Sequence, residues 1–274
     1  MSDAEQQAQT NGLFLKTALV LWILALCGAL LVLPYVATLE NEALAAATAR
    51  THFKMRELLT ISVVQTAVLL AIAVIMGQWA AQKICLGTPL IKAILTRNRV
   101  PEEMLSTLLS AFAIGVAMGL ALLALDHWFF APIPSVAELI HSVERGSTRP
   151  SAWQGFLASF YGAIDEEVLM RLGVMSLLAL VFRTLARMRG ANPKLALSAG
   201  VFWSANIVTA VLFGLAHLPV TAVLVPLSMA LVVRAIVLNG TVGIVFGALY
   251  RRYGLEWAMA SHFGVDIVIH VGLT

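Results

Sequence analysis

Charged residues are scarce in this chain. Asp, Glu, Lys and Arg make up 12% of the 274 residues, and 60% of the residues are hydrophobic. Ordinary soluble domains contain about 25% charged and about 45–50% apolar residues. With a mean hydropathy of +0.88, the composition therefore indicates an integral membrane protein rather than a soluble one.

Motifs that would point to several other functions are missing. The two cysteines, Cys27 and Cys85, have no CxxC spacing and lie on different segments, which argues against a disulfide framework and a zinc knuckle. The net charge of +3 comes from residues at helix ends rather than from a basic run with aromatics, so no nucleic-acid partner is expected. There is no GxSxG nucleophile turn and no HExxH zinc motif.

Windows of about 20 apolar residues predict an all-α fold, a polytopic transmembrane helical bundle with about eight crossings. The first window is longer than a signal-peptide core, and its leader carries Asp3 and Glu5 instead of a positive cluster, so we expect a retained helix. The fourth window is too long for a simple span. The expected spans are Leu13–Val36, Leu58–Ala81, Met104–Phe130, Trp153–Met188, Leu195–Leu218, Thr221–Leu238, Gly240–Tyr253 and Trp257–Gly272.

These spans sort the basic residues between the two membrane faces. Ten of the 18 Lys and Arg residues, Arg234 among them, fall on the side of the N-terminus, and seven, including Arg251 and Arg252, fall on the other. The positive-inside rule then favours a cytoplasmic N-terminus by a narrow margin. We expect residues 1–274 to form one membrane domain, in which 1–150 carry no motif and 151–274 form a catalytic core.

The most informative residues are Glu166, Glu167 and Arg171 in the fourth span. A charge at mid-bilayer costs roughly 2.5–3.5 kcal/mol, so such residues are usually functional. On a helix, Glu167 and Arg171 share one face and form a supporting pair, while Glu166 points about 100 degrees away and stays free. An ion pair that only joins helices would explain Glu167 and Arg171 but not Glu166.

Further polar groups lie in later spans. His217 ends the fifth span just before a proline that closes the helix. His262 and Asp266 are four residues apart, so they share one face of the last span. Taken singly, a histidine such as His217 is more often a cap or a packed polar group, and a carboxylate that orients a histidine is common. If the chain crosses the membrane eight times, however, Glu166, His217 and His262 all lie toward the same leaflet.

A carboxylate, two imidazoles and an aspartate inside a bundle are suited to activating water. Glu166 would act as the general base, and His217 and His262 would position the water or polarise a carbonyl group. Alternatively, Glu166, His217 and His262 would surround a divalent metal such as zinc, since carboxylate and imidazole are suitable ligands. The residues alone leave both mechanisms open.

The ordered set of motifs resembles a known family, the CAAX protease and bacteriocin-processing family of intramembrane proteases. Its EExxxR, FxxxH and HxxxN/D motifs are matched in order by Glu166-Glu167-xxx-Arg171, Phe213-xxx-His217 and His262-xxx-Asp266. The run from Gly243 to Gly254 also looks like the glycine-rich helix and turn of that family. The resemblance covers about residues 150–274, and residues 1–150 show none.

This resemblance implies an intramembrane endopeptidase acting on a membrane-associated or lipidated protein, as the eukaryotic members act on prenylated proteins. It implies Glu166 as the base, His217 as a helper in water activation, and His262 with Asp266 on the oxyanion side. The family is labelled metalloprotease, although a glutamate-dependent mechanism without an obligatory metal is also implied.

Two departures from the family pattern stand out. Asp266 replaces the asparagine of the prenyl-protein protease, and a carboxylate cannot donate an amide hydrogen bond unless it is protonated. This shifts Asp266 toward orienting His262 or binding a metal. Around Arg171, Met170 and Leu172 stand where the family favours an aromatic residue and a glycine.

Two other classes of function stay open at this point. An ion-coupled transporter also uses intramembrane Glu, Asp and His, but the chain shows no obvious inverted repeat. A non-catalytic immunity or scaffold protein of the same fold would have no need of an intact motif set. The alanine- and leucine-rich composition favours a prokaryotic cytoplasmic (inner) membrane, where bacteriocin processing, self-immunity or signalling would provide the substrate.

Overall fold

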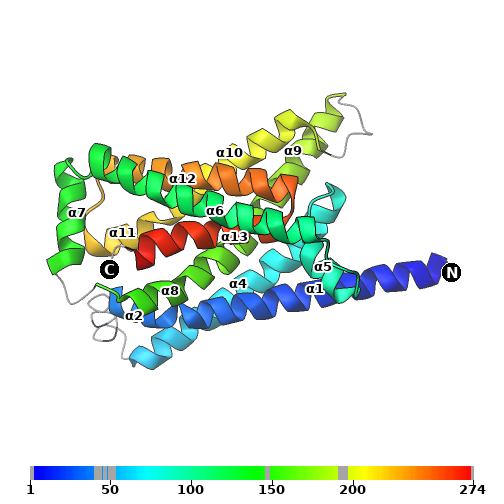
Figure 1. The fold of residues 1–274 in the computed structure, drawn as a ribbon, viewed down its shortest axis with the longest axis horizontal. Helices are drawn as coiled ribbons and strands as arrows, with labels where there is room; N and C mark the ends of the chain where they lie inside the picture. Colours follow the sequence, from blue (N-terminus) through cyan, green and yellow to red (C-terminus); the bar gives the residue numbers. More distant parts are fainter. Residues whose placement is uncertain are drawn as a thin grey trace.

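The computed structural model describes residues 3–39, 45, 48, 54–145, 149–190 and 197–272. Every regular element in these ranges is a helix, which confirms the predicted all-α fold. Within these ranges, six helices are long and apolar enough to cross a membrane, and the chain is an integral membrane protein. The crossing helices lie side by side, whereas α7 (Pro134–Arg145) lies across one end of the bundle (Figure 1).

The first four predicted spans correspond to helices of the structure. The fourth is one long helical rod of four segments, two of them with π-helical geometry, which explains why its apolar window exceeded a simple span. The elements in chain order are α1 (Asp3–Leu31), α2 (Leu33–Leu39), α4 (Met55–Lys83), α5 (Pro89–Leu95), α6 (Glu102–Leu125), η1 (Asp126–Phe130), then α7, and the rod of α8 (Ala152–Tyr161), η2 (Gly162–Glu166), η3 (Val168–Met175) and α9 (Ser176–Met188).

The predicted sixth and seventh spans are wrong, because most of their residues belong to one helix. α10 (Ala199–Ala216) and α11 (Leu218–Leu224) are followed by α12 (Met229–Arg252), which continues through Asn239 without a break. The Asn239 side chain donates to the Ala235 carbonyl oxygen at 3.0 Å, so its amide is satisfied within the helix. The break comes earlier, between α11 and α12, where Pro226 interrupts the helix.

The last predicted span is helical as well, as α13 (Leu255–Asp266) and η4 (Ile267–Val271). It is not among the six helices long and apolar enough to cross by themselves. Its polar residues Glu256, His262 and Asp266 are buried by neighbouring helices. The predicted number of eight crossings is therefore not confirmed.

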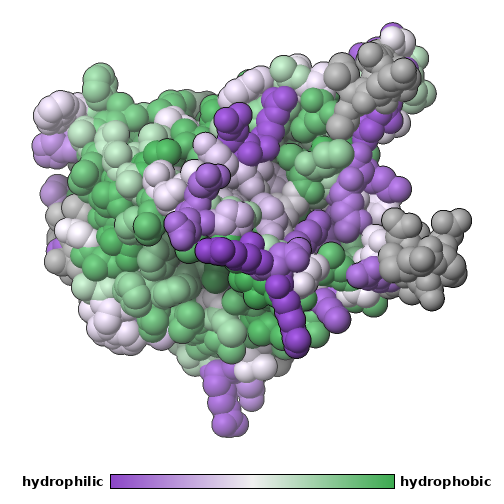
Figure 2. All heavy atoms as spheres, turned by 45° about the vertical axis from the view of Figure 1, so that its right-hand side comes forward, coloured by the Kyte–Doolittle hydropathy of each residue, from purple (hydrophilic) through white to green (hydrophobic). Residues whose placement is uncertain are grey.

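The single crossing of α12 also corrects the distribution of basic residues. The Leu255 backbone N–H, just past the end of α12, donates to the Gly87 carbonyl oxygen at 3.0 Å, so α12 ends beside α5. Arg251 and Arg252 therefore lie at the end of the bundle that carries the N-terminus, and Arg234 lies toward the opposite end. The basic bias of the N-terminal end thus increases. Figure 2 shows hydrophilic side chains gathered there beside an apolar flank.

Small residues let α13 enter the middle of the bundle. A side chain at Gly115 of α6 would collide with the backbone of Ser261, and one at Gly264 of α13 would collide with the backbone of Phe112. The two helices therefore approach at backbone distance, as small residues permit in membrane bundles. This contact presses the other face of α13, which carries His262 and Asp266, against η2.

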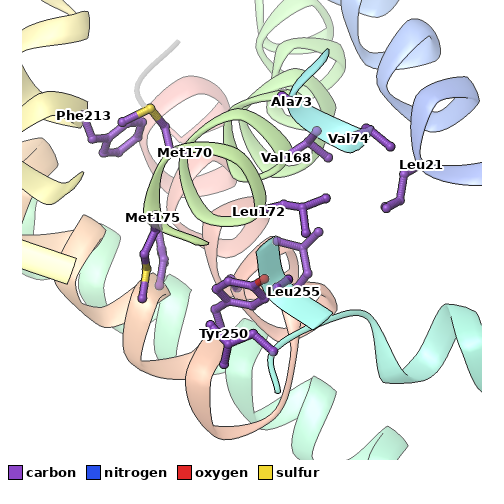
Figure 3. Packing of buried hydrophobic residues seen from close by; sticks show 14 of the residues in the cluster. Leu21, Ala73, Val74, Val168, Met170, Leu172, Met175, Phe213, Tyr250 and Leu255 are labelled. Atoms are coloured by element: carbon purple, nitrogen blue, oxygen red, sulfur yellow. The ribbon is translucent and has the colours of Figure 1, made fainter. Parts of the chain in front are cut away.

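The largest hydrophobic core surrounds η3. Val168, Leu172 and Met175 are fully buried there, together with Tyr250 of α12 and Leu255 of α13. Figure 3 shows the η3 side chains pointing into this core, with Phe213 beside Met170. The segment that carries Glu166 and Glu167 is thus held on several sides by packed side chains.

Candidate active site

Glu166 and Glu167 lie where the long rod has π-helical geometry. η2 ends at Glu166 and η3 begins at Val168. Single π turns insert an extra residue into a helix and often occur at functional sites. The Glu167 side chain is completely buried, whereas the Glu166 side chain is 25% exposed. The two adjacent carboxylates therefore face different environments, in agreement with the directions expected for neighbours on a helix.

Glu167 and Arg171 form a buried ion pair. The Arg171 Nη1 atom lies 2.9 Å from Glu167 Oε1. The guanidinium carbon lies 4.6 Å from the ring centre of Phe213 and 5.1 Å from that of Phe246. Cation–π contacts of this kind stabilise a desolvated arginine. The expected pairing at four-residue spacing is thus present in the structure.

His262 joins this ion pair to Glu166. Its Nδ1 atom lies 2.8 Å from Glu167 Oε1, and because a carboxylate only accepts, Nδ1 carries the hydrogen. Its Nε2 atom faces Glu166 Oε2 at 3.8 Å and Asp266 Oδ1 at 3.6 Å. The Phe246 ring stacks on the imidazole at a centroid distance of 4.6 Å. The contact of Nδ1 with Glu167 and the stacking of Phe246 on one face of the ring therefore fix the orientation of His262.

Asp266 and Gly162 complete this side of the site. A side chain at Gly162 would collide with the Asp266 carboxylate and would lie 3.2 Å from His262 Nε2. Glycine at this position of η2 thus leaves room for the His262 and Asp266 side chains. The Asp266 carboxylate stands beside His262, on the face that the four-residue spacing predicted.

His217 lies apart from the other three. It follows the last residue of α10, and its Nδ1 atom lies 2.8 Å from the Phe213 carbonyl oxygen. Because a carbonyl oxygen only accepts, Nδ1 donates and Nε2 is left to accept. Among the described residues, no hydrogen bond or ion pair connects His217 with Glu166, His262 or Asp266.

A cavity of about 350 Å³ brings the four residues together, since Glu166, His217, His262 and Asp266 all line it. A second cavity of about 440 Å³ also contains Glu166 and His217 and is walled mainly by apolar residues of α1, α2 and α4. A third, of about 680 Å³, shares Tyr35, Arg234 and His270 with the first. The four residues thus face a hollow interior, and both neighbouring cavities have a mainly apolar lining, with several charged and polar residues in the third.

Comparison with known proteins gives a match to the part of the chain that carries these residues. Residues 148–268 match the family model described as type II CAAX prenyl endopeptidase Rce1-like. These residues are similar to that family, and we refer to them as the Rce1-like domain. The match agrees with the resemblance of the three motifs to the CAAX protease and bacteriocin-processing family, and it lies within the part that carries them. No curated protein and no solved structure matches the chain.

The predicted topology of the Rce1-like domain, which was expected to bring these residues together, was partly wrong. His262 was expected at the start of a last span, after two further crossings. The structure has one crossing, α12, between α11 and α13, and His262 lies in the second half of α13. His262 reaches Glu166 because it lies well inside α13 rather than at its start.

The expected metal site does not fit the described residues of the Rce1-like domain. Among them, no group of three or more His, Cys, Asp or Glu side chains is arranged to hold a metal ion. His262 and His217 donate from Nδ1 to Glu167 and to a backbone carbonyl, which leaves Nε2 of each ring available, but no hydrogen bond or ion pair of the described residues joins His217 to Glu166 or His262. A zinc ion would need at least three ligands that converge. We therefore derive no step through a metal.

Several residues around the cavity were not predicted from the sequence. His270 lies four residues beyond Asp266, with its Nε2 atom 4.0 Å from Asp266 Oδ1, so the same spacing that related His262 to Asp266 would have found it. The Tyr35 hydroxyl contacts His270 Nδ1 at 3.1 Å across 235 positions of sequence, and no local pattern predicts that contact. Arg234, counted only as a helix-end charge, pairs with Asp126 at 2.6 Å.

Phe246 is expected to act as a positioning residue, because it lies against both His262 and Arg171. Phe246→Leu should lower kcat roughly 3- to 10-fold with little change in KM, because the energy of one aromatic contact corresponds to a rate effect of this size. Phe263→Leu is the matched control, since Phe263 packs on Phe112, Phe156 and Phe160 rather than against Arg171. Steady-state kinetics of both variants, with Tm measured alongside, would decide, and equal losses of kcat would contradict the role of Phe246.

Proposed function

We propose that this protein is an intramembrane endopeptidase that hydrolyses a peptide bond with water activated by Glu166. The Rce1-like domain supports a protease-like role. The observation that carries the proposal further is the arrangement of Glu166: its partly exposed carboxylate lines a cavity together with His217, His262 and Asp266. A general base needs access to water, and Glu166 has such access while Glu167 does not.

The reaction would proceed in two stages. Glu166 takes a proton from a water molecule that His217 Nε2 helps to position, and the water oxygen attacks the carbonyl carbon of the substrate. Nε2 of protonated His262, oriented by Glu167 and Asp266, donates to the oxygen that becomes negatively charged. The C–N bond then breaks, and protonated Glu166 returns the proton to the leaving amine.

The neighbouring cavities favour a membrane-associated or lipidated substrate. The cavity of about 440 Å³ adjoins Glu166 and is lined by apolar residues such as Val32, Leu59 and Val63. Apolar space next to the reacting group suits a lipid chain or an apolar side chain anchored in the bilayer. A prokaryotic cytoplasmic membrane is the location that we propose, from composition alone.

Hydrolysis of paired peptides in detergent would test this proposal. Each peptide is offered with and without a lipid anchor, and products are identified by mass spectrometry. We expect cleavage at one bond, at least about tenfold faster for the anchored peptide, because remote binding energy contributes to the reaction. The same assay after exhaustive chelation should retain full activity. Loss of activity that zinc restores would instead support a metal held by Glu166, His217 and His262.

The cleavage experiment and an uptake assay together separate the alternatives. Absence of cleavage of every peptide would contradict the proposal and favour a scaffold or immunity protein. Uptake of an ion or solute into proteoliposomes, without cleavage, would favour a transporter.

A further inference from the structure

A polar pocket lies at the N-terminal end of the bundle, where α4, α5 and α12 end or begin. It has a volume of about 260 Å³ and is separate from the cavities around Glu166. Lys92 of α5 and Arg251 and Arg252 from the last turn of α12 line it. These cations come from two segments about 160 positions apart in sequence, so only the fold brings them together.

None of the three cations forms an ion pair with a described residue. Arg251 lies over the Phe202 ring at 4.4 Å and Arg252 over the Tyr253 ring at 5.7 Å, contacts that orient a guanidinium without neutralising it. The buried carboxyl group of Glu256, two residues beyond the lining residue Gly254, accepts from the Ile91 backbone N–H at 2.9 Å. Burial raises the pKa of the Glu256 carboxyl group to about 7, against the opposing effect of the nearby Lys92 ammonium group.

A buried hydroxyl group adds a second kind of donor. Thr88 lines the pocket and is 2% exposed, and its Oγ1 atom has no hydrogen-bond partner among the described residues. Buried polar groups without partners are uncommon and call for an explanation. An ammonium, two guanidiniums and a hydroxyl all donate, and a phosphate group offers several accepting oxygens.

We propose that this pocket binds a phosphate group, as carried by the headgroup of an anionic phospholipid. The pocket lies at the end of membrane-crossing helices, where headgroups are located, and basic pockets between such helices bind anionic lipids. Its volume lies below the range of about 300–1,000 Å³ typical of drug-sized ligands, so a headgroup fits better than a nucleotide. This inference does not depend on the peptidase activity.

Thermal unfolding of the full chain in detergent tests the proposal. Phosphatidylglycerol at saturation should raise Tm by roughly 5 °C more than zwitterionic phosphatidylcholine does, because a ligand that binds only the folded state stabilises it. The triple variant Lys92→Gln, Arg251→Gln, Arg252→Gln should lose this difference. Thr88→Val, which removes one hydroxyl at nearly constant volume, should reduce it.

A matched control removes the same charge from the same end. Lys83→Gln, Arg99→Gln, Arg189→Gln changes three exposed residues that do not line the pocket and should keep the response to phosphatidylglycerol. Inorganic phosphate is tested as a second ligand in the same thermal-unfolding assay. An equal, pocket-dependent shift with phosphate would identify a soluble phosphate ligand rather than a lipid. An undiminished lipid response in the pocket variant, or equal losses in both triple variants, would overturn the proposal.

Discussion

Glu166→Gln should lower peptide hydrolysis by about 10²- to 10⁴-fold, the usual contribution of a positioned general base. Glutamine keeps the shape of the side chain and its place on the cavity wall, but it cannot take a proton from water. The Glu166 side chain is 25% exposed and makes no hydrogen bond with a described residue, so the protein should fold normally. Initial rates of peptide cleavage, with Tm as a check of folding, measure the effect.

A carboxylate outside the cavity provides the control for this variant. Glu103, in the first turn of α6, is exposed and lines none of the three cavities around Glu166. Glu103→Gln removes the same charge and should leave the rate unchanged. Hydrolysis by Glu166→Gln at the rate of the unchanged protein would remove Glu166 from the mechanism.

Arg171→Met should destabilise the protein by about 3–5 kcal/mol, the cost of leaving a buried charge without its partner. Arg171 and Glu167 are both completely buried, and their contact at 2.9 Å neutralises both charges. Without Arg171, only His262 Nδ1 remains as a donor to the Glu167 carboxylate. Chemical unfolding in detergent would measure the loss, and hydrolysis should fall because His262 loses a fixed partner.

The double variant Glu167→Gln, Arg171→Met separates charge from packing. With both charges removed, stability should recover by at least about half of the loss, because buried ion pairs replaced by neutral groups often cost little. Activity should stay low, since glutamine holds His262 less firmly than a carboxylate does. A double variant no more stable than Arg171→Met would show that the rings of Phe213 and Phe246, rather than the ion pair, carry the stabilising role of Arg171.

The errors in the predicted topology have an identifiable cause. Asn239 and Gly240 were interpreted as a break between two spans, because polar residues and glycine are common in turns. The structure shows that Asn239 satisfies its amide on the Ala235 carbonyl within α12. A polar side chain lowers the mean hydropathy of a window. Within a helix, however, that side chain can donate a hydrogen bond to a backbone carbonyl oxygen one turn away. The predicted span over residues 221–238 failed for a different reason, because it runs across the break at Pro226 between α11 and α12.

The amino-acid sequence alone was sufficient to predict the class of this protein and the local part of its site. Composition established a helical membrane protein, and four-residue spacing predicted that Glu167 would meet Arg171 and that Asp266 would lie beside His262. These inferences succeed because helical geometry depends only on neighbours along the chain. The same four-residue spacing, applied from Asp266, also predicts that His270 lies on this face.

Contacts between helices were decided only by the tertiary structure. Close packing of Gly115 and Gly264 at the α6–α13 contact sets the depth at which His262 faces Glu166. Tyr35 meets His270, and Lys92 joins Arg251 and Arg252, through contacts that no local pattern encodes. The spacing of residues fixes which of them share a helix face. Which faces meet depends on the shapes of the packed surfaces, and these exist only in the folded protein.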